Sequence, residues 1–322
     1  MKRRQLLSTI ALAASTLLCS NVIAQTDKPL RVIVGFPGGV SIDVVTRILS
    51  DKLKDELKRP VIVDNRPGAG GRLAAEVLKS AAPDGNTVMV TPIVVPVLSP
   101  LVFNKLNYNP ETDFTPVVRV CDFSFGLAVS AEKKKKNLAE YAAWIKANPS
   151  NASFGSPAAG SLPHFFGEMI GSALSVDMVH VPFNGGAALR AAVLGRHAPA
   201  GIDVVLEWLQ NAKAKKVTVL ATSGATRSKV MPDVPTFKEQ GYPNIVGQGW
   251  FAMYAPAKTP AAATNEINKA MNKVLAMPDV REKFAALGLE AGGGSEADLQ
   301  KTMVDDTKRW APIVKKTGFK AD

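Results

Sequence analysis

Short apolar segments alternate with longer segments of helical periodicity along the first third of the chain. Residues 31–34 form a compact apolar run that is typical of a buried strand. From Val44 to Leu57, apolar residues recur every three or four positions, which predicts an amphipathic helix. The same order continues with a strand at 61–63, a helix at 73–81 and a strand at 87–90. Alternating strands and helices favour an α/β fold with parallel strands.

The alternation restarts after Ser130 and predicts a second α/β unit. Its expected elements are a helix at 138–147, a strand at 152–155, a helix at 162–173, a strand at 178–181, a helix at 187–194, and strands at 200–205 and 217–221. The tail differs, because it carries helical patterns that begin near Pro260 and near Leu299. A chain of 322 residues is longer than one hydrophobic core usually supports, so we expect two lobes.

Strand-like runs at 117–129 and 217–221 mark the places where we expect the chain to cross between the lobes. We therefore assign residues 25–122 and 223–322 to lobe one and residues 123–222 to lobe two. Each lobe is expected to contain a parallel sheet flanked by helices.

The first 24 residues have the three parts of a secretory signal peptide. Residues 2–4 are basic, residues 6–18 are largely apolar, and residues 22–24 resemble a small-residue cleavage site. We therefore assign residues 1–24 to a cleaved signal peptide and expect the mature chain in the periplasm. The paired arginines leave the choice between the general and the twin-arginine export routes open. Beyond the leader, no run reaches the ~18 uninterrupted apolar residues that a membrane helix needs.

The formal net charge of +11 raises the question of a nucleic-acid partner. The basic residues are spread over the predicted helix faces. The densest run, at residues 133–136, precedes a helix that Asn137 is expected to cap. We interpret this run as a solvated turn and expect no nucleic-acid partner.

Residue types that carry metal or catalytic chemistry are sparse. Cys121 is the only cysteine after the leader, and its apolar neighbours favour a place in the core. His164, His180 and His197 are 16 and 17 residues apart and form no recognisable set of metal ligands. The chain also lacks the nucleophile elbow, the zinc-protease motif and the P-loop. We therefore expect no enzyme activity, no metal and no cofactor.

Four glycine-rich loops lie where predicted strands lead into predicted helices. They span residues 36–43, 65–72, 155–164 and 182–187. Ligands of α/β sheets bind at the carboxyl ends of strands, and a helix start favours an anion by roughly 0.3 to 1 kcal/mol. The alternative for each loop is an ordinary turn, with Ser41 and Ser161 as helix caps and Asp43 as a partner of the helix dipole.

Seven segments, taken in order, form a recognisable signature. They are Phe36–Asp43, Asn65–Gly71, Ala82–Gly85, Leu106–Pro116, His180–Gly186, Met231–Thr236 and Tyr254–Pro256. Together they resemble the substrate-binding proteins of tripartite tricarboxylate transporters, the Bug family of periplasmic receptors. The similarity extends from about residue 28 to about residue 318, and the Asn-Arg-Pro-Gly-Ala-Gly-Gly element is its most specific part.

The resemblance implies a two-lobed, type II periplasmic-binding-protein fold, with a mixed, mostly parallel sheet flanked by helices in each lobe. A ligand cleft between the lobes would close on a small organic carboxylate. The receptor would then deliver this carboxylate to the membrane subunits of the transporter. We expect it to act as a monomer without a cofactor. The alternative function is a ligand sensor that presents the carboxylate to a membrane histidine kinase. An enzyme is the third possibility, and it would require a catalytic motif that the sequence lacks.

Carried over residue by residue, the resemblance implies ligand contacts from both lobes. Lobe one would contribute Phe36, Gly39, Val40, Ser41 and Asp43, with Thr91 at the end of a strand. Lobe two would contribute Ser156, Gly160, Ser161, His164, Phe183, Asn184, Gly186 and Asp203. We expect Ser41 and Ser161 to donate hydrogen bonds to a ligand carboxylate from opposite lobes.

Several positions depart from the family pattern. Val40 replaces a glycine, and Ile42 stands where threonine is frequent. Residues 157–159 and 162–163 replace a run that is usually rich in glycine and hydroxyl groups. Fewer polar donors and more apolar surface favour an aromatic or branched carboxylate as the ligand.

Overall fold

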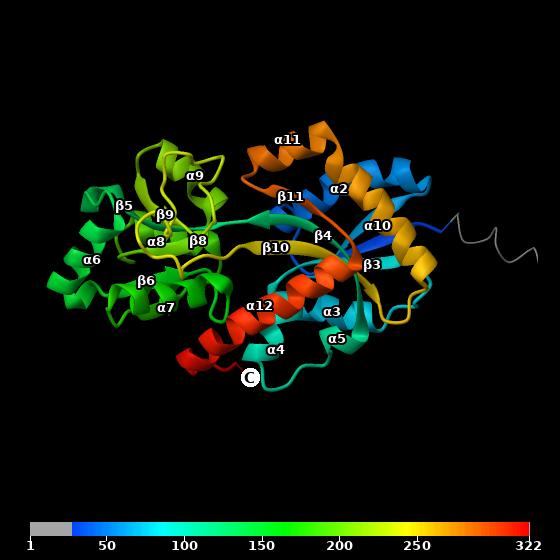
Figure 1. Ribbon diagram of the computed structural model, residues 1–322, viewed down its shortest axis with the longest axis horizontal. Helices are drawn as coiled ribbons and strands as arrows, with labels where there is room; N and C mark the ends of the chain where they lie inside the picture. The colour runs from blue at the N-terminus through cyan, green and yellow to red at the C-terminus, as the bar shows by residue number, and fades with distance from the viewer. Residues whose placement is uncertain (1–27, 322) are drawn as a thin grey trace, which may run out of the picture.

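The computed structural model describes residues 28–321, so the signal peptide assigned to residues 1–24 lies outside the described residues. Two β-sheets lie side by side, each flanked by helices (Figure 1). The six-stranded sheet contains β1 (Leu30–Val34), β2 (Val61–Asn65), β3 (Thr87–Pro92), β4 (Phe114–Phe123), β10 (Gly249–Pro256) and β11 (Glu290–Gly293). The five-stranded sheet contains β5 (Phe125–Ser130), β6 (Ser153–Ser156), β7 (Val179–Pro182), β8 (Gly201–Val204) and β9 (Val217–Thr222). We refer to the half with the six-stranded sheet as lobe one and to the other half as lobe two.

Most strands within each sheet run in the same direction. The six-stranded sheet has the order β11-β4-β10-β3-β1-β2, and β10 and β11 run opposite to the rest. The five-stranded sheet has the order β7-β6-β8-β5-β9, and β5 is reversed. The predicted fold class, with two mixed and mostly parallel sheets, is therefore confirmed. The exact lobe bounds assigned from the sequence stay a prediction.

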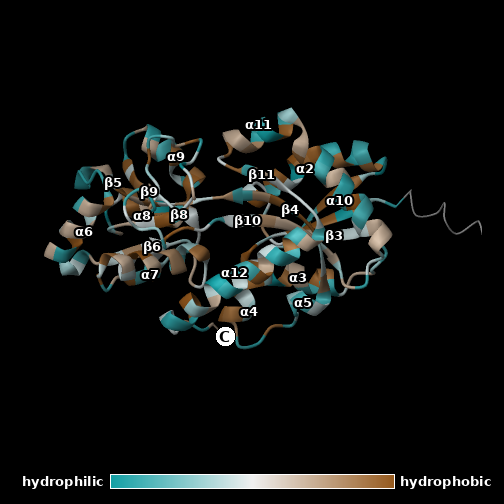
Figure 2. Ribbon diagram, in the orientation of Figure 1, coloured by the Kyte–Doolittle hydropathy of each residue, from teal (hydrophilic) through white to brown (hydrophobic). Residues whose placement is uncertain are grey.

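Helices cover both faces of the lobe-one sheet (Figure 1). One face carries α2 (Ser41–Leu57), α10 (Ala261–Ala276) and α11 (Pro278–Ala286), and the other carries α3 (Arg72–Lys79), α4 (Ser99–Val102), α5 (Pro110–Asp113) and α12 (Glu296–Thr317). Lobe two is surrounded by α6 (Leu138–Ala147), α7 (Leu162–Leu174), α8 (Gly186–Leu194) and α9 (Val205–Lys213). The helices carry hydrophobic and hydrophilic residues on different sides (Figure 2), which is the pattern that lets them bury one side against a sheet.

The chain crosses between the lobes through tightly bonded segments. Only Ser124 separates β4 from β5, and residues 223–248 return the chain from β9 to β10. At the crossing, the backbone N–H of Phe125 donates to the Ser223 hydroxyl oxygen (3.0 Å), and the Ser223 hydroxyl donates to the Gly247 carbonyl (2.7 Å). The outgoing and returning segments are thus hydrogen-bonded to each other at the boundary.

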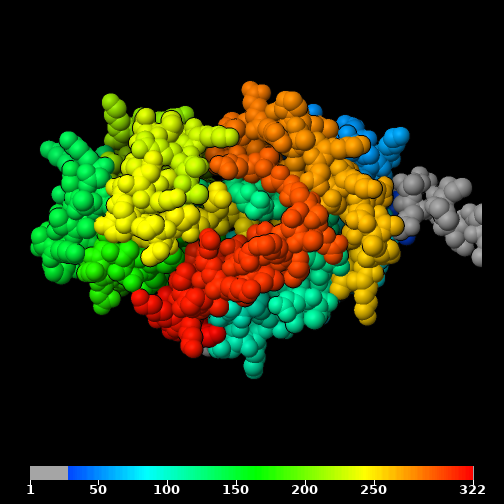
Figure 3. All heavy atoms as spheres, in the orientation of Figure 1, coloured from blue at the N-terminus to red at the C-terminus, as the bar shows by residue number. Residues whose placement is uncertain are grey.

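The C-terminal helix α12 of lobe one also reaches lobe two. Trp310 is buried and packs edge-on against Phe166 of α7, with 5.2 Å between the ring centroids. Beyond the helix, Phe319 packs edge-on against His164, at 5.1 Å. The space-filling view shows α12 extending across the boundary, next to a recess that both lobes border (Figure 3). The relative position of the lobes therefore depends on α12 as well as on the strand crossings.

Six strands and helices are absent from the sequence-based prediction, namely β10, β11, α4, α5, α9 and α11. The helix α9 begins at Val205 directly after β8, so its start merges with the predicted strand. Met277 is both the C-cap of α10 and the N-cap of α11, which hides the break between these helices. The edge strand β11 is short and rich in glycine, a composition that does not indicate a strand.

Two smaller predictions can be compared directly with the structure. Cys121 is fully buried in β4, which confirms its place in the core. The side chain of Asn137 caps α6 by accepting a hydrogen bond from the backbone N–H of Glu140 (2.9 Å). The basic run that precedes this cap therefore ends at a helix start, as expected.

Candidate functional site

A cavity of about 340 Å³ lies between the two sheets, where β1, β3, β6 and β8 end. Lobe one lines it with Phe36, Val40, Ser41, Ile42, Pro92, Ile93, Val94, Phe251 and Leu289. Lobe two lines it with Phe125, Pro157, Ser161, Leu162, Pro163, Asp203, Val204 and Leu206, and Phe123 lies at the crossing. Among these residues, Ser41, Ser161 and Asp203 have polar side chains. The cavity wall is therefore mainly apolar.

The lobe-one loop is organised by the buried carboxylate of Asp43. The N–H of Gly39, which has a φ of 86°, donates to Asp43 Oδ2 (2.8 Å), and Arg47 Nε donates to the same oxygen (2.9 Å). Asn65 Nδ2 donates to Asp43 Oδ1 (2.9 Å) and to the Phe36 carbonyl (3.0 Å). Burial opposes ionisation, but these hydrogen bonds hold the pKa of Asp43 below its ordinary value. Asp43 thus orders the loop and does not line the cavity.

The start of α2 opens into the cavity without a side-chain cap. Val40 occupies the N-cap position, so the alternative that Ser41 caps this helix is wrong. Val40 is 40% exposed and lines the cavity together with Ser41. The first N–H groups of a helix have no partner within the helix. An anion in the cavity can therefore satisfy them.

In the lobe-two loop, the hydroxyl groups are directed inward. Ser156 is fully buried, and its hydroxyl donates to the Ala158 carbonyl (2.9 Å). Ser161 lines the cavity, but its hydroxyl donates to the same carbonyl (2.6 Å). Ser161 is the N-cap residue of α7, as the capping alternative expects, but its side chain makes no cap hydrogen bond.

His164 stabilises the lobe-two loop through a hydrogen bond and ring stacking. The N–H of Gly160, which has a φ of 70°, donates to His164 Nδ1 (3.1 Å), so this nitrogen is the unprotonated one. The His164 ring stacks on His180, with 3.8 Å between the centroids, and His180 Nε2 lies 2.7 Å from the Ser156 hydroxyl oxygen. Burial, together with the nearby His164, lowers the pKa of His180 to about 4. This stack fixes the loop and lies outside the cavity lining.

Asp203 is the buried acidic side chain of the cavity, with 5% of its surface exposed. Its Oδ1 accepts a hydrogen bond from the Val204 N–H (2.8 Å), whereas Oδ2 has no hydrogen-bond partner among the described residues. The nearby Arg190 is paired with Glu207. Burial raises the pKa of Asp203 to about 7, and Glu207 adds to this effect.

The structure brings part of the predicted site together. Phe36, Val40, Ser41, Ser161 and Asp203 line the cavity. The remaining predicted residues lie outside its lining: Gly39, Asp43, Gly160 and His164 shape the two loops, Thr91 and Ser156 are buried at strand ends, Phe183 packs beside Gly155, Asn184 is exposed, and Gly186 opens α8. Ligand contact by these residues stays a prediction.

Sequence reasoning missed most of the apolar wall. Phe123 and Phe125 lie within the run at 117–129 that predicts a crossing between the lobes. That position at the base of a cleft is the signal that could have identified both rings. Phe251 and Leu289 come from β10 and from the residue before β11, neither of which is predicted from the sequence pattern.

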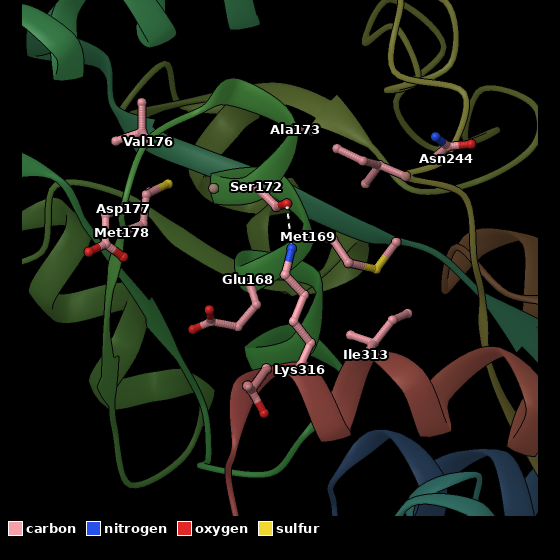
Figure 4. A pocket seen from close by; sticks show the side chains of 13 residues that line it. Glu168, Met169, Ser172, Ala173, Val176, Asp177, Met178, Asn244, Ile313 and Lys316 are labelled. Atoms are coloured by element: carbon pink, nitrogen blue, oxygen red, sulfur yellow. Dashed lines mark hydrogen bonds between the residues drawn. The ribbon is translucent and has the colours of Figure 1, made fainter.

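A second cavity, of about 460 Å³, lies between α7 and α12 (Figure 4). Its lining includes Glu168, Asp177 and Asn244. Lys316 of α12 reaches toward α7 and donates to the Ser172 hydroxyl oxygen (3.0 Å). None of the residues predicted for the site lines this cavity, and no strand ends at it. We therefore take the cavity between the sheets as the candidate site.

Two kinds of feature are absent from residues 28–321. No group of three or more histidine, cysteine or acidic side chains in this part of the chain could hold a metal ion. No helix in the same part has both the length and the apolar character needed to cross a bilayer.

Comparison with known proteins identifies the family. Residues 45–319 match the model of the tripartite tricarboxylate transporter family receptor. The chain belongs to this family. The receptor is 31% identical to the protein BugT of Bordetella pertussis, over 99% of each chain.

Two solved structures are also similar to this receptor. MatC from Rhodopseudomonas palustris with bound malate is 28% identical and has a TM-score of 0.78, covering 89% of this chain and 99% of MatC. The R. palustris protein Rpa4515 with adipate is 25% identical and has a TM-score of 0.83, covering 91% of this chain and 98% of Rpa4515. The fold is thus shared with proteins whose structures contain carboxylates, and the family match gives the general role of a substrate-binding receptor.

Proposed function

We propose that this receptor binds a small organic carboxylate between its lobes and delivers it to the membrane subunits of a tripartite tricarboxylate-type transporter. The observation that carries the proposal is the cavity between the sheets, which loops of both lobes line and into which α2 opens. The malate in MatC and the adipate in Rpa4515 support a carboxylate as the class of ligand.

The chemistry of the cavity wall supports a ligand with one charged group on an apolar body. Phe36, Phe125 and Phe251 contribute aromatic surface, and the polar side chains are limited to two serines and one aspartate. A pocket of this kind favours an apolar ligand that a few polar groups orient. We therefore propose an aromatic or branched monocarboxylate.

The start of α2 is the proposed position of the ligand carboxylate. The Ser41 hydroxyl and the free N–H groups of the first helical turn are donors there. Such donors satisfy an anion directly, and the helix dipole adds a favourable field. Ser161 and Asp203 would approach the ligand from lobe two.

We also propose that the mature receptor begins near Gln25 and acts as a monomer in the periplasm. The basic and apolar segments of residues 1–24 support export. Mass spectrometry of the periplasmic fraction should detect a chain that starts at this residue. A full-length chain confined to the cytoplasmic fraction would contradict this part of the proposal.

Closure of the lobes on the ligand is part of the proposed mechanism, because contacts from both sides favour the closed population. The strand crossing at Ser124 and Ser223 is the proposed hinge. Small-angle scattering should record a smaller radius of gyration at saturating ligand. An unchanged scattering curve would argue against closure.

A thermal-shift screen of carboxylic acids tests the binding function. An acid present at 100 times its dissociation constant stabilises the folded receptor by about 2.7 kcal/mol. We expect aromatic and branched monocarboxylates to give the largest shifts. Ser41→Ala should reduce the shift, whereas Ser172→Ala, in the cavity between α7 and α12, should leave it unchanged. The proposal fails if no acid shifts the transition or if only Ser172→Ala reduces the shift.

A further inference from the structure

The cavity between the sheets contains a buried carboxyl group whose charge has no partner. Asp203 has 5% of its surface exposed, and its Oδ2 makes no hydrogen bond with any described residue. Its other oxygen accepts one hydrogen bond from the Val204 N–H. An ionised carboxylate in such a place lacks both water and a compensating cation, so the neutral acid is favoured.

The elements packed around Asp203 supply little positive charge to balance an ionised carboxylate. Arg190 of α8 is the neighbouring cation, but it is already paired with Glu207 of α9. On β5, the residue that pairs with Asp203 is Gly126, which has no side chain. Gly186 lies so close that an added Cβ would be 2.6 Å from Asp203 Oδ2. The lobe-one part of the cavity lining contains no charged side chain.

We propose that the receptor takes up one proton when it binds its carboxylate, and that Asp203 holds this proton and donates it in an O–H···O hydrogen bond to the ligand. This inference rests on the proposed function, because it assumes that a carboxylate enters the cavity. Where Asp203 is ionised in the free receptor, its O–H bond forms as a hydronium ion or a buffer acid gives up a proton. The proton comes from solvent and returns to solvent when the ligand leaves.

The donors available in the cavity support this assignment. The Ser161 hydroxyl proton is already donated to the Ala158 carbonyl, so Ser161 offers the ligand a hydrogen-bond acceptor. A protonated Asp203 adds a donor from lobe two, and a hydrogen bond between an acid and a carboxylate is short and strong. If Asp203 were ionised, two like charges would share one apolar cavity.

Proton uptake predicts a specific dependence of affinity on pH. Burial raises the pKa of Asp203 to about 7 in the free receptor, so the acid form is present without ligand below this pH. Above it, each ligand must bring a proton, and affinity should fall by about tenfold per pH unit. Between pH 5.5 and 6.5, affinity should change little.

Calorimetry with 3-phenylpropionate, in phosphate and in Tris buffers, measures the protons taken up per ligand. Uptake should approach about one proton at pH 8 and should be small at pH 6. Asp203→Asn keeps a neutral donor, so this variant should bind without proton uptake and should not weaken above pH 7. Ser41→Ala is the control, because it should lower affinity while leaving proton uptake unchanged.

The ligand-free receptor provides a second readout. Because its pKa is raised on folding, Asp203 should make the wild-type protein progressively less stable as pH rises from about 4 to about 7. The melting temperature of Asp203→Asn should therefore rise relative to that of the wild type as pH increases across this range. A difference that stays constant with pH would overturn the assignment of the proton to Asp203.

The ligand panel distinguishes failure of the proposed function from failure of the proton-uptake proposal. If neither 3-phenylpropionate, isovalerate, malate nor adipate binds, the proposed function fails, and proton uptake fails with it. If one of them binds at pH 8 without proton uptake, the proton-uptake proposal alone fails. Phenylalanine differs from 3-phenylpropionate by its ammonium group. Tighter binding of phenylalanine that Asp203→Asn abolishes would show that an ionised Asp203 reads an ammonium, and it would overturn the proposal.

Discussion

The two loops that form the entrance to the cavity share a local design and differ in the group that holds them. In lobe one, the N–H of Gly39 donates to Asp43, and in lobe two the N–H of Gly160 donates to His164. In both loops the acceptor lies four residues after the glycine, in the first turn of the following helix. The glycines have positive φ values of 86° and 70°, which explains the residue type at these positions.

The acceptors and their surroundings differ. Asp43 is an anion that Arg47 and Asn65 bind within lobe one. His164 is an aromatic ring that stacks on His180 and contacts Phe319 from the C-terminal segment of lobe one. The lobe-one loop is therefore held by its own lobe, whereas the lobe-two loop is also coupled to the position of α12. We expect the first loop to be preorganised and the second to respond to lobe closure.

Removal of the Asp43 carboxylate should have the largest effect. Asp43→Ala leaves the Gly39 N–H and the Asn65 amide without their acceptor, and the loss of hydrogen bonds to a buried charge should cost about 3 kcal/mol of unfolding free energy. Urea denaturation measures this loss. Asp51→Ala, at an exposed position on the same helix, is the control and should change stability by less than about 0.5 kcal/mol. A loss below about 1 kcal/mol for Asp43→Ala would contradict the role given to Asp43.

Substitution of the two serines should affect ligand affinity to different extents. The Ser41 hydroxyl is free to donate to a ligand carboxylate, and the loss of such a bond costs about 1.5 to 3 kcal/mol, or roughly ten- to hundredfold in affinity. The Ser161 hydroxyl is already bonded to Ala158, so Ser161→Ala should weaken binding less and lower the stability of the free receptor by about 1 kcal/mol. Calorimetry and thermal denaturation together measure both effects. Equal losses of affinity would show that Ser161 turns toward the ligand.

The contact between Phe319 and the lobe-two loop should have an intermediate effect. Phe319 is half-buried, and Gly160 lies against its ring. Phe319→Ala should lower the unfolding free energy by about 1 to 2 kcal/mol through lost apolar burial. It should also increase hydrogen exchange at residues 158–164 while leaving residues 36–43 unchanged. Lys315→Ala, at an exposed position on α12, is the control. Equal changes in both loops would show that α12 does not distinguish them.

Much of the fold follows from patterns that are local in the sequence. The strand and helix periods predict β1 to β3 and α6 to α8 because each element buries one side against a neighbour that is close in sequence. Local patterns do not predict the strands β10 and β11, because their partner β4 is far away in the chain. The apolar cavity wall that Phe251 provides is missed for the same reason.

For the site, the sequence predicts the loops better than the direction of their side chains. Glycine and serine mark where the chain turns at a helix start, so Ser41 and Ser161 are found at the cavity. Whether Asp43 and His164 point toward a ligand or toward their own loop depends on hydrogen bonds that form only in the fold. The four-residue spacing from glycine to acceptor is a signal in the sequence that could have indicated that these side chains point toward their own loops.

The smallest effect should come from the titration of His180, and it should be confined to the lobe-two loop. Burial lowers the pKa of His180 to about 4, below the ordinary histidine value of about 6.5 in the unfolded chain. At this site the unfolded chain therefore binds more protons between these values, and the contribution of His180 to stability should be lost as pH falls from about 6.5 to about 4. It opposes the contribution of Asp203 over the same range. Because the ring is partly exposed, we expect a loss of about 1 kcal/mol.

His180→Phe keeps an aromatic ring beside His164 but removes the titrating group. As pH falls across this range, its unfolding free energy should therefore rise relative to that of the wild type, whereas the exposed His197→Gln should behave like the wild type. Hydrogen exchange should locate the acid-sensitive region at residues 156–164, while the loop held by Asp43 should keep its protection, because the pKa of that carboxylate lies below its ordinary value. Equal loss of protection in both loops would show that the histidine stack does not make lobe two the more acid-sensitive half.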